Sequence, residues 1–398
     1  MVESITERGV FMNRYTDVPA GVGIGTYSLS GAYGKKNLDE FRRMLLCAVE
    51  KGVKFFDTSE TYGDETEQFL GDTFRGVRKE IFLCTKVGMK GKKKPDLSYE
   101  SVRHSCEKSL KNLSTEYIDL YMIHFDDPQT PVEETVQALS DLQNEGKIRQ
   151  YGVSHLPVRR VTQYCDIGSP GSIMAEFSAV SPGARYELFP LCRDRNIALI
   201  AFSVTGRGIL TGKYDSIREF ETGDIRRLDP LFKREKLECA LAISKGIEDI
   251  AIETGITRAQ LSIAWVLSHP VVRVALTGPS TIAHMLENIR AQEISVASDV
   301  IKEIDGIIEN QRAMLRTRQE ETVTDILSDS LPDEPSEALS VLMYVAETVV
   351  ELGLVSEELV MGRAMKLFSI QDRESEEFRQ ELLSFRAFLS EQPGLWRN

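Results

Sequence analysis

Four reactive side chains lie at or near the ends of short apolar segments in the first third of the sequence: Asp57, Tyr62, Lys86 and His124. A free phenol has a pKa of about 10 and is therefore a poor proton donor at neutral pH. A neighbouring ammonium group stabilises the phenolate and lowers that pKa, and a carboxylate can hold the ammonium in place. A neutral histidine beside them could donate a hydrogen bond to a carbonyl oxygen. If the four side chains converge, their types predict a site of proton transfer.

Each of these residues also has a purely structural interpretation. Asp57 could cap a helix, and Lys86 could be a solvated charge at the end of a strand. His124 could be a core histidine whose hydrogen bonds are satisfied, and Tyr62 could pack against a turn. The prediction of a site therefore depends on whether the elements that position these residues bring the four segment ends together.

Short apolar runs rich in β-branched residues alternate with longer segments of helical period between about residues 20 and 310. Eight runs are expected to be strands, namely 21–27, 53–57, 81–86, 118–124, 151–154, 173–177, 197–203 and 272–278. Strands that are apolar on both faces and alternate with helices form a parallel sheet. Eight such units predict a (β/α)8 TIM barrel, whose functional residues lie at the carboxyl ends of the strands. Gly52 and Gly146 stand where two of the helices should end.

Composition divides the chain into three parts. Residues 1–315 are expected to form the barrel, 316–336 a polar linker with two prolines, and 337–398 a small acidic helical extension. The stretch from 316 to 398 holds 17 Asp and Glu against 8 Arg and Lys, so most of the formal charge of −13 lies there. Its helices have an apolar face, including Leu339, Leu342 and Ala346, that is too large to stay exposed. The face is expected to pack on the barrel or on another subunit, so the extension is a candidate surface for a homo-oligomer. A regulatory or partner-binding module is the alternative to a simple packing role.

The composition also argues against several classes of protein. A surface with a formal charge of −13 is a poor partner for nucleic acid, because such binding needs clustered Lys and Arg. The six cysteines form no CxxC pair, and the five histidines show no HxxxH or HExxH spacing, which argues against disulfides and a metal site. The beginning of the sequence does not resemble a signal peptide, and Glu347 and Glu351 interrupt the most apolar stretch. We therefore expect a soluble, cytoplasmic protein with no metal and no membrane partner.

Ordered motifs along residues 20–312 resemble those of the aldo-keto reductase family. They include GIGTY, FFDTSETYG, FLCTKVG, YIDLYMIHFDDP, GKIRQYGVSH, LFPLCRDRNIALIAFSVTGRGILTGKY, AQLSIAWVL and GPSTIAHMLEN. The resemblance implies an oxidoreductase that transfers hydride between a nicotinamide cofactor and a small aldehyde or ketone. It implies Tyr62 as the general acid/base, Lys86 and Asp57 as the pair that tunes it, and His124 as the residue that orients the substrate carbonyl. An alternative function is a non-turnover nicotinamide-binding regulatory or scaffold subunit of the same fold.

The resemblance also implies which residues surround the cofactor. Asp57 is implied to contact the cofactor as well as to act in catalysis. The other implied residues are Gly25, Thr26 and Tyr27 as a wall of the nicotinamide pocket; Ser154, His155 and Met174 at the carboxamide; Phe202 as the stacking ring, followed by Ser203, Thr205 and Gly206; and Gly278, Ser280, Thr281, His284, Glu287 and Asn288 on the adenosine side. NADP(H) is expected rather than NAD(H). The Gly-rich stretch GVGIGTYSLSG is not the GxGxxG of a dinucleotide-binding Rossmann fold.

Several of these positions depart from the family pattern. His155 stands where the family usually has Asn, Met174 where it usually has Gln, and Phe202 where Tyr is common. Near GPSTIAHMLEN no Lys or Arg occupies the place that usually faces the 2′-phosphate, although Ser and Thr hydroxyls can also hold phosphate. The substrate is not specified by these motifs, and Tyr27, Phe125 and the insertion at 205–232 are candidates for lining its pocket.

Overall fold

The structure, a computed structural model, describes residues 18–392 apart from 35, 91–93, 215, 217–219, 221–223, 228 and 371. The chain divides into two compact units. The first comprises the residues up to 211 together with 251–301, and the second comprises 212–250 and the residues from 302 onward. The second unit thus contains most of the segment that the sequence analysis treated as an insertion after the seventh strand.

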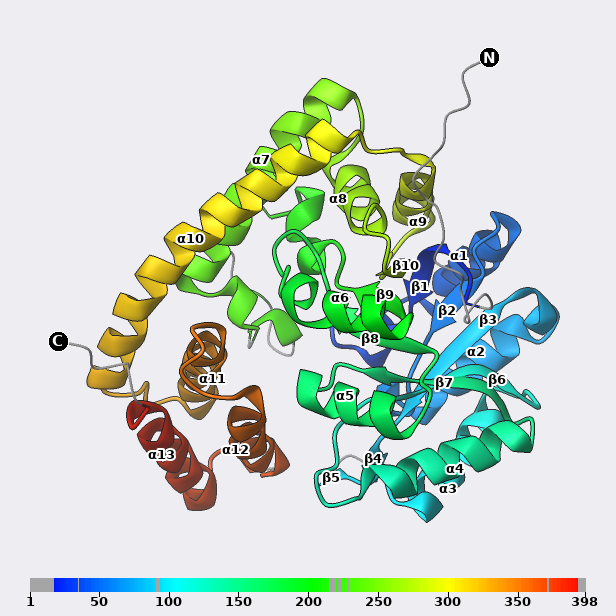
Figure 1. The fold of residues 1–398 in the computed structure, drawn as a ribbon, viewed down its shortest axis with the longest axis horizontal. Helices are drawn as coiled ribbons and strands as arrows, with labels where there is room; N and C mark the ends of the chain where they lie inside the picture. Colours follow the sequence, from blue (N-terminus) through cyan, green and yellow to red (C-terminus); the bar gives the residue numbers. More distant parts are fainter. Residues whose placement is uncertain are drawn as a thin grey trace. The chain divides into compact units, whose positions relative to one another are not determined.

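Eight parallel strands close into a barrel in the first unit (Figure 1). Their order around the ring is β1–β10–β9–β8–β7–β6–β3–β2. The strands are β1 (Gly21–Gly25), β2 (Phe55–Asp57), β3 (Phe82–Val87), β6 (Ile118–Ile123), β7 (Ile148–Ser154), β8 (Ser172–Glu176), β9 (Ala198–Phe202) and β10 (Val272–Thr277). Each of the eight expected runs overlaps one of them, which confirms the predicted (β/α)8 fold. A short antiparallel pair, β4 (Met89–Lys90) and β5 (Lys94–Pro95), lies in the loop after β3.

The strands are apolar because both of their faces are covered, and every residue of β3 and β6 is buried. Large side chains fill the inside of the barrel, and the rings of Phe55 and Phe82 stack there with their centres 5.6 Å apart. Gly23 makes room for them, because a Cβ at this position would lie 2.9 Å from Val274 Cγ1 and 3.0 Å from the ring of Phe55. The barrel is therefore a packed core and not a pore.

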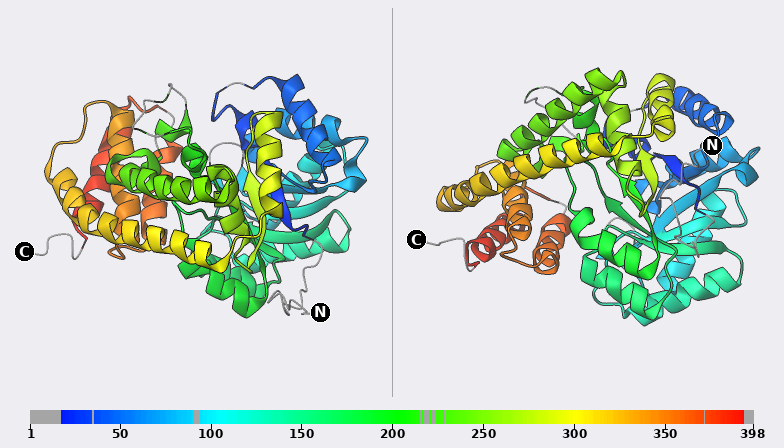
Figure 2. Two further views of the ribbon diagram at one scale, coloured as in Figure 1. Left: turned by 90° about the horizontal axis from the view of Figure 1, so that it is seen from above. Right: turned by 45° about the horizontal axis from the view of Figure 1, so that its top comes forward.

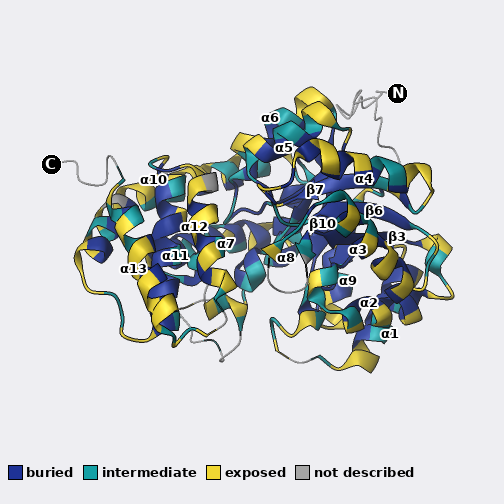
Figure 3. Cartoon of the chain, turned by 90° about the horizontal axis from the view of Figure 1, so that it is seen from below, coloured by how far each residue is buried: buried dark blue, intermediate teal, exposed yellow. Residues whose placement is uncertain are grey.

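Helices surround the strands, as the views in Figure 2 show for the first unit. They are α1 (Leu38–Glu50), α2 (Asp64–Phe74), α3 (Tyr99–Asn112), α4 (Val132–Asn144), α5 (Val158–Ile167), α6 (Ala184–Arg195), α8 (Arg258–Leu267) and α9 (Ile282–Arg290). Their inner faces are buried and their outer faces are exposed (Figure 3). Gly52 and Gly146 follow α1 and α4 with φ values of +86° and +73°, a left-handed conformation that glycine adopts without strain. The predicted ends of these two helices are confirmed.

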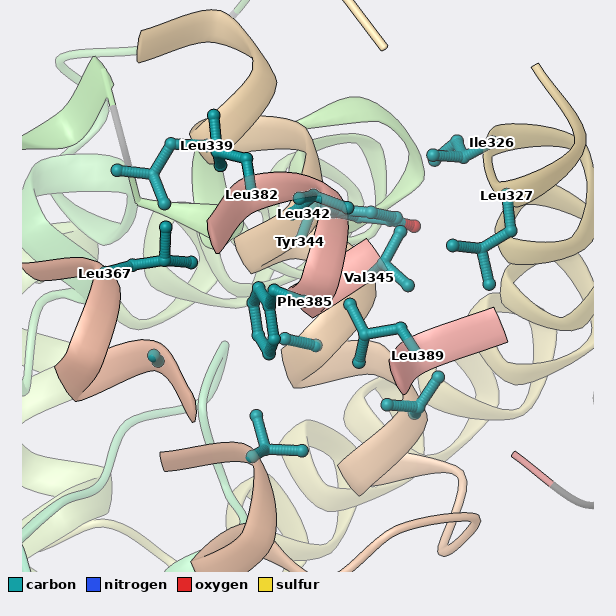
Figure 4. Close-up of a cluster of buried hydrophobic side chains, with 14 of the residues drawn as sticks. Ile326, Leu327, Leu339, Leu342, Tyr344, Val345, Leu367, Leu382, Phe385 and Leu389 are labelled. Atoms are coloured by element: carbon teal, nitrogen blue, oxygen red, sulfur yellow. The ribbon is translucent and has the colours of Figure 1, made fainter. Parts of the chain in front are cut away.

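The second unit is helical. It contains most of α7 (Arg234–Thr254) and of α10 (Ser298–Ser328), together with α11 (Pro335–Glu351), α12 (Glu357–Ser369) and α13 (Glu376–Ser390). Figure 4 shows the apolar core that α10–α13 build. Polar contacts tie α7 to α11: Tyr344 donates a buried hydrogen bond to Glu235, and the buried Lys236 pairs with the exposed Glu347 and Glu351.

The linker expected at 316–336 is wrong for most of its length, because α10 continues to Ser328. Val323 lies about one helical turn before Ile326 and Leu327, and all three are buried in the core of the second unit. Figure 4 labels Ile326 and Leu327. Polar residues dominate this stretch, but its few apolar side chains share one face, and burying that face favours a helix. The non-helical segment between α10 and α11 is shorter than the expected linker, and it ends at Glu334, whose side chain caps α11.

The apolar face of the extension is covered by helices of its own unit. Leu339, Leu342 and Ala346 are buried among α10, α12 and α13. Their burial therefore requires neither the barrel nor a second subunit, in contrast to what the sequence analysis expected. Across the part of the chain that the structure describes, none of the helices combines the length and the apolar character needed to span a membrane.

Candidate active site

The carboxyl ends of three adjacent strands bring together the reactive residues singled out in the sequence. Asp57 is the last residue of β2, Lys86 is the second-to-last residue of β3, and His124 directly follows β6. These strands are neighbours in the ring, with Asp57 beside Cys84 and Lys86 beside Met122. Tyr62 joins them because a 3-10 turn, Glu60–Tyr62, leads from the end of β2 back over the barrel.

Lys86 lies at the centre of the group and is only 1% exposed. Its Nζ is 2.5 Å from Oδ1 of Asp57, donates a hydrogen bond to the carbonyl oxygen of Thr58 at 2.8 Å, and lies 3.5 Å from the hydroxyl of Tyr62. Burial by itself lowers the pKa of an amine, but here the attraction of Asp57 and of Tyr62 outweighs it and raises the pKa of Lys86. The group therefore stays an ammonium ion beside the phenol.

Tyr62 is protonated throughout the neutral range. Burial raises its pKa to about 12, and the nearby ammonium of Lys86 only partly opposes this effect. The net direction is opposite to the one expected from the ammonium alone, because desolvation of a phenolate outweighs the attraction at this position. Tyr62 thus keeps its proton until a reacting group takes it.

His124 is neutral and has a defined partner on one ring nitrogen. Burial, together with the charge of Lys86, holds the pKa of His124 well below its usual range. Its Nδ1 lies 2.9 Å from the hydroxyl of Ser59 and 3.4 Å from that of Thr61. The rings of His124 and Tyr62 meet edge to face with their centres 6.0 Å apart, so the two side chains are neighbours. Ser59 was not singled out in the sequence, although it stands within the motif DTSETYG, two residues after Asp57.

The residues expected as a wall of the nicotinamide pocket lie beside this group. Thr26 is fully buried, and both its backbone N–H and its hydroxyl donate to the carbonyl oxygen of Asp57 at 2.9 Å. It therefore fixes the end of β2 and does not present its hydroxyl to a ligand. The ring of Tyr27 lies 5.0 Å from that of Tyr62, and Gly25 pairs with Asp57 across β1 and β2.

The residues expected at the carboxamide and the expected stacking ring come from three adjacent strands, β7, β8 and β9. Ser154 pairs with Met174 in the sheet, and the N–H of His155 donates to the carbonyl oxygen of Met174 at 2.9 Å. His155 meets the edge of Phe202 with ring centres 5.6 Å apart. The thioether of Met174 is buried in the interior of the barrel, and Phe202 packs against the same cluster. The partly exposed ring of Phe202 thus lies beside the polar residues at the end of β7.

A second charged pair at this edge was missed in the sequence. Arg207 donates two hydrogen bonds to Glu176, at 2.5 and 2.9 Å, and both side chains are 20% exposed. The pair joins the end of β8 to the loop after β9, and no local pattern links two residues 31 positions apart.

The loop after β9 is a compact turn formed by Ser203, Thr205 and Gly206. The N–H of Gly206 donates to the carbonyl oxygen of Ser203 at 2.7 Å, and Thr205 accepts from two later N–H groups. Gly206 has φ of +55°, and a Cβ there would lie 2.5 Å from Val180 Cγ2. Only glycine fits this turn without a shift of Val180.

The residues expected on the adenosine side surround the beginning of α9, directly after β10. Gly278, Ser280, Thr281 and His284 are exposed, Glu287 is half-buried and Asn288 is buried. The hydroxyl of Thr281 caps the helix by accepting a hydrogen bond from the N–H of His284 at 3.2 Å. Arg290, the next Lys or Arg after this segment, ends α9 and so lies about 12 Å along the axis from its beginning.

The sequence model of the Aldo/keto reductase family matches residues 21–309 of this chain. The chain belongs to this family. The matched span contains the whole barrel and every residue of the site described above, and it ends before α11 begins. Aldo/keto reductases are nicotinamide-dependent carbonyl oxidoreductases, and membership assigns the chain to that class of enzyme.

Related proteins align with about three quarters of this chain. Aldo-keto reductase yakc of Schizosaccharomyces pombe, whose name includes NADP(+), is 32% identical over 304 residues that cover 74% of this chain and 89% of that protein. The solved glycerol dehydrogenase AKR11B4 of Gluconobacter oxydans is 26% identical with a TM-score of 0.67, covering 75% of this chain and 94% of that one. An aldo/keto reductase of Klebsiella pneumoniae, solved with NADP and acetate, is 25% identical with a TM-score of 0.57 over 73% and 92% of the two chains.

Proposed function

We propose that this aldo/keto reductase reduces an aldehyde or ketone with NADPH, and runs the reverse oxidation with NADP(+), using Tyr62 as the general acid/base. One observation supports the assignment above the others. The buried ammonium of Lys86 lies 2.5 Å from Asp57 and 3.5 Å from the Tyr62 hydroxyl. A phenol held against a fixed cation can release its proton to a substrate, because the cation stabilises the phenolate that remains.

The protein residues divide the proton transfer among them. Tyr62 donates its hydroxyl proton to the carbonyl oxygen as the carbonyl carbon accepts hydride, and the product is an alcohol. Lys86 stabilises the resulting phenolate, and Asp57 holds Lys86 in place. His124 donates a hydrogen bond to the carbonyl oxygen and orients it toward Tyr62. In the oxidation the same atoms act in reverse, with the Tyr62 phenolate accepting the hydroxyl proton of the alcohol.

The residues around this group suit a nicotinamide cofactor, which when bound supplies or accepts the hydride. Phe202 offers a partly exposed ring for stacking, and Ser154 and His155 offer polar atoms for a carboxamide. Gly25 and Tyr27 border the same space, and Ser203, Thr205 and Gly206 would hold the phosphates. Met174 offers only a thioether where an amide would bind the carboxamide, so one hydrogen bond, worth about 0.5–1.5 kcal/mol, is lost.

The adenosine side favours NADP(H) over NAD(H) only modestly. Ser280, Thr281 and His284 surround the exposed N-terminus of α9, where backbone N–H groups favour an anion such as the 2′-phosphate. Gly278, Glu287 and Asn288 complete this side. The relative named with NADP(+) and the related structure solved with NADP support the same cofactor. The alternative of a non-turnover nicotinamide-binding subunit has no observation in its favour, since all four groups required for proton transfer are present.

The test separates cofactor binding from proton transfer. NADPH and NADH binding are titrated by fluorescence, and a panel of aldehydes and ketones is then assayed for turnover. Tyr62→Phe should lower turnover by about 10²–10⁴, the usual contribution of a positioned acid, with NADPH affinity almost unchanged. Tyr27→Phe is the matched control: its ring lies 5.0 Å from that of Tyr62, but the phenol that the structure brings to 3.5 Å from the ammonium of Lys86 is that of Tyr62. Near-normal turnover of a folded Tyr62→Phe protein would refute the mechanism.

A further inference from the structure

We propose that Ser59 is a positioning residue that selects the Nε2–H tautomer of His124, and so supplies the hydrogen-bond donor that the substrate carbonyl needs. This inference rests on the proposed function, because it assigns the donor of that reaction. Neutral imidazole has one N–H and one acceptor nitrogen, and the partner of the second nitrogen decides which is which.

The backbone fixes Ser59 against the histidine. Ser59 is fully buried and stands in extended conformation before the turn Glu60–Tyr62, where its hydroxyl accepts from the N–H of Thr61 at 3.2 Å. The same oxygen lies 2.9 Å from Nδ1 of His124, 65 residues later in the chain. The cap that starts the turn bearing Tyr62 is therefore also the group that contacts the histidine.

The protons in this cluster can be placed one by one. A hydroxyl has one proton and two lone pairs. Ser59 Oγ uses one lone pair for the N–H of Thr61, and its neighbours at 2.9 Å are the Thr61 hydroxyl and Nδ1 of His124. With the Thr61 hydroxyl donating to Ser59 and Ser59 donating to Nδ1, every buried proton has an acceptor. Nδ1 is then the acceptor nitrogen, and Nε2 holds the ring proton.

The opposite arrangement is chemically unsuited to the proposed substrate. If Nδ1 donated to Ser59, the Ser59 hydroxyl would instead donate its hydrogen bond to the Thr61 oxygen. Nε2 would then carry no proton and would present a lone pair to the lone pairs of a carbonyl oxygen. Thr61 is exposed and can exchange hydrogen bonds with water, whereas the buried Ser59 hydroxyl depends on its protein neighbours. Protonation of the whole ring is disfavoured, since burial and Lys86 hold the pKa of His124 well below its usual range.

The tautomer is measured directly on the full chain labelled with ¹⁵N-histidine, without cofactor or substrate, at pH 7.5. The two ring nitrogens of a neutral histidine have well-separated ¹⁵N shifts, and a His124→Gln spectrum assigns the signal among the five histidines. Wild type, Ser59→Thr and the matched control Thr61→Val should all show a protonated Nε2. Ser59→Ala should show averaged shifts of both tautomers and a kcat/KM lower by about 2- to 12-fold, the factor that one neutral hydrogen bond provides.

Three results would overturn the proposal: a protonated Nδ1 in wild type, an unchanged spectrum in Ser59→Ala, or a change of tautomer in Thr61→Val. The wild-type spectrum needs no variant, so the test does not depend on the folding of Ser59→Ala. Turnover is judged separately. A protonated Nε2 in a protein that reduces no carbonyl would refute the proposed function and leave the tautomer assignment standing.

Discussion

Removing the ammonium of Lys86 should affect stability and turnover by amounts that can be separated. In Lys86→Met the Asp57 carboxylate, 2% exposed, loses the cation that lies 2.5 Å from it. Removing one partner of a buried ion pair typically costs about 3–5 kcal/mol of unfolding free energy, because the other charge stays buried. Tyr62 loses the only cation that the structure, within its described residues, brings to hydrogen-bonding distance of its hydroxyl. A hydrogen bond to a charged group contributes about 1.5–3 kcal/mol, so turnover should fall about 10- to 150-fold.

The double variant Asp57→Val/Lys86→Met distinguishes the two effects. Replacing a buried ion pair by apolar residues is often neutral for stability, so most of the lost unfolding free energy should return. Turnover should stay low, because the phenolate of Tyr62 still lacks its cation. The matched control is Lys108→Met, which removes an ion pair of 2.8 Å to Asp64 whose side chains are 49% and 44% exposed. That change should cost less than about 1 kcal/mol.

Stability is followed by urea unfolding with tryptophan fluorescence. The chain has two tryptophans, and Trp265 is fully buried in the barrel unit. A Trp396→Phe background removes the other, which lies outside the described residues, so that Trp265 alone reports on the barrel. Turnover is followed by the absorbance of NADPH. If Lys86→Met is as stable as the control, or if the double variant regains turnover, the role of this ion pair is misassigned.

Three further changes test other parts of the molecule. Ser280→Arg should increase the preference for NADPH over NADH in fluorescence titrations, because it adds a cation beside the N-terminus of α9. If wild type already binds NADPH more than about 10³-fold more tightly than NADH, roughly 4 kcal/mol, then a cation has been overlooked. His124→Gln should make stability less sensitive to acid, because burial and Lys86 keep His124 unprotonated when folded, whereas the unfolded chain takes up a proton below about pH 6.5. Between pH 6.5 and 5.5, wild type should therefore lose about 1 kcal/mol more unfolding free energy than the variant in urea titrations. Phe385→Ala should destabilise the second unit by about 3–5 kcal/mol, measured by calorimetry, while kcat stays within twofold; loss of turnover would show that the core of this unit supports the active site.

Local pattern was sufficient for the barrel and for three of its catalytic candidates. Parallel strands covered on both faces must be continuously apolar, so each of the eight runs was visible in the sequence. Asp57, Lys86 and His124 then followed from their places at strand ends, because a closed parallel barrel gathers those ends at one rim. Local pattern failed for residues 316–328, where polar composition suggested a linker. Val323, Ile326 and Leu327 form a helix there because other helices bury their shared face.

Three properties of the site depend on contacts between distant parts of the chain. Ser59 meets His124 across 65 residues and Arg207 meets Glu176 across 31, and no spacing rule relates such pairs. The raised pKa of Tyr62 also depends on tertiary contacts. The attraction of Lys86, which lowers this pKa, was foreseeable from the residue types, but the larger effect of burial, which raises it, was not. The sequence by itself therefore determined which groups stand at the rim of the barrel, because strand periodicity and chain order are local. Tertiary structure alone decided their protonation states and hydrogen-bond partners, because burial and short-range contact arise only when the barrel closes.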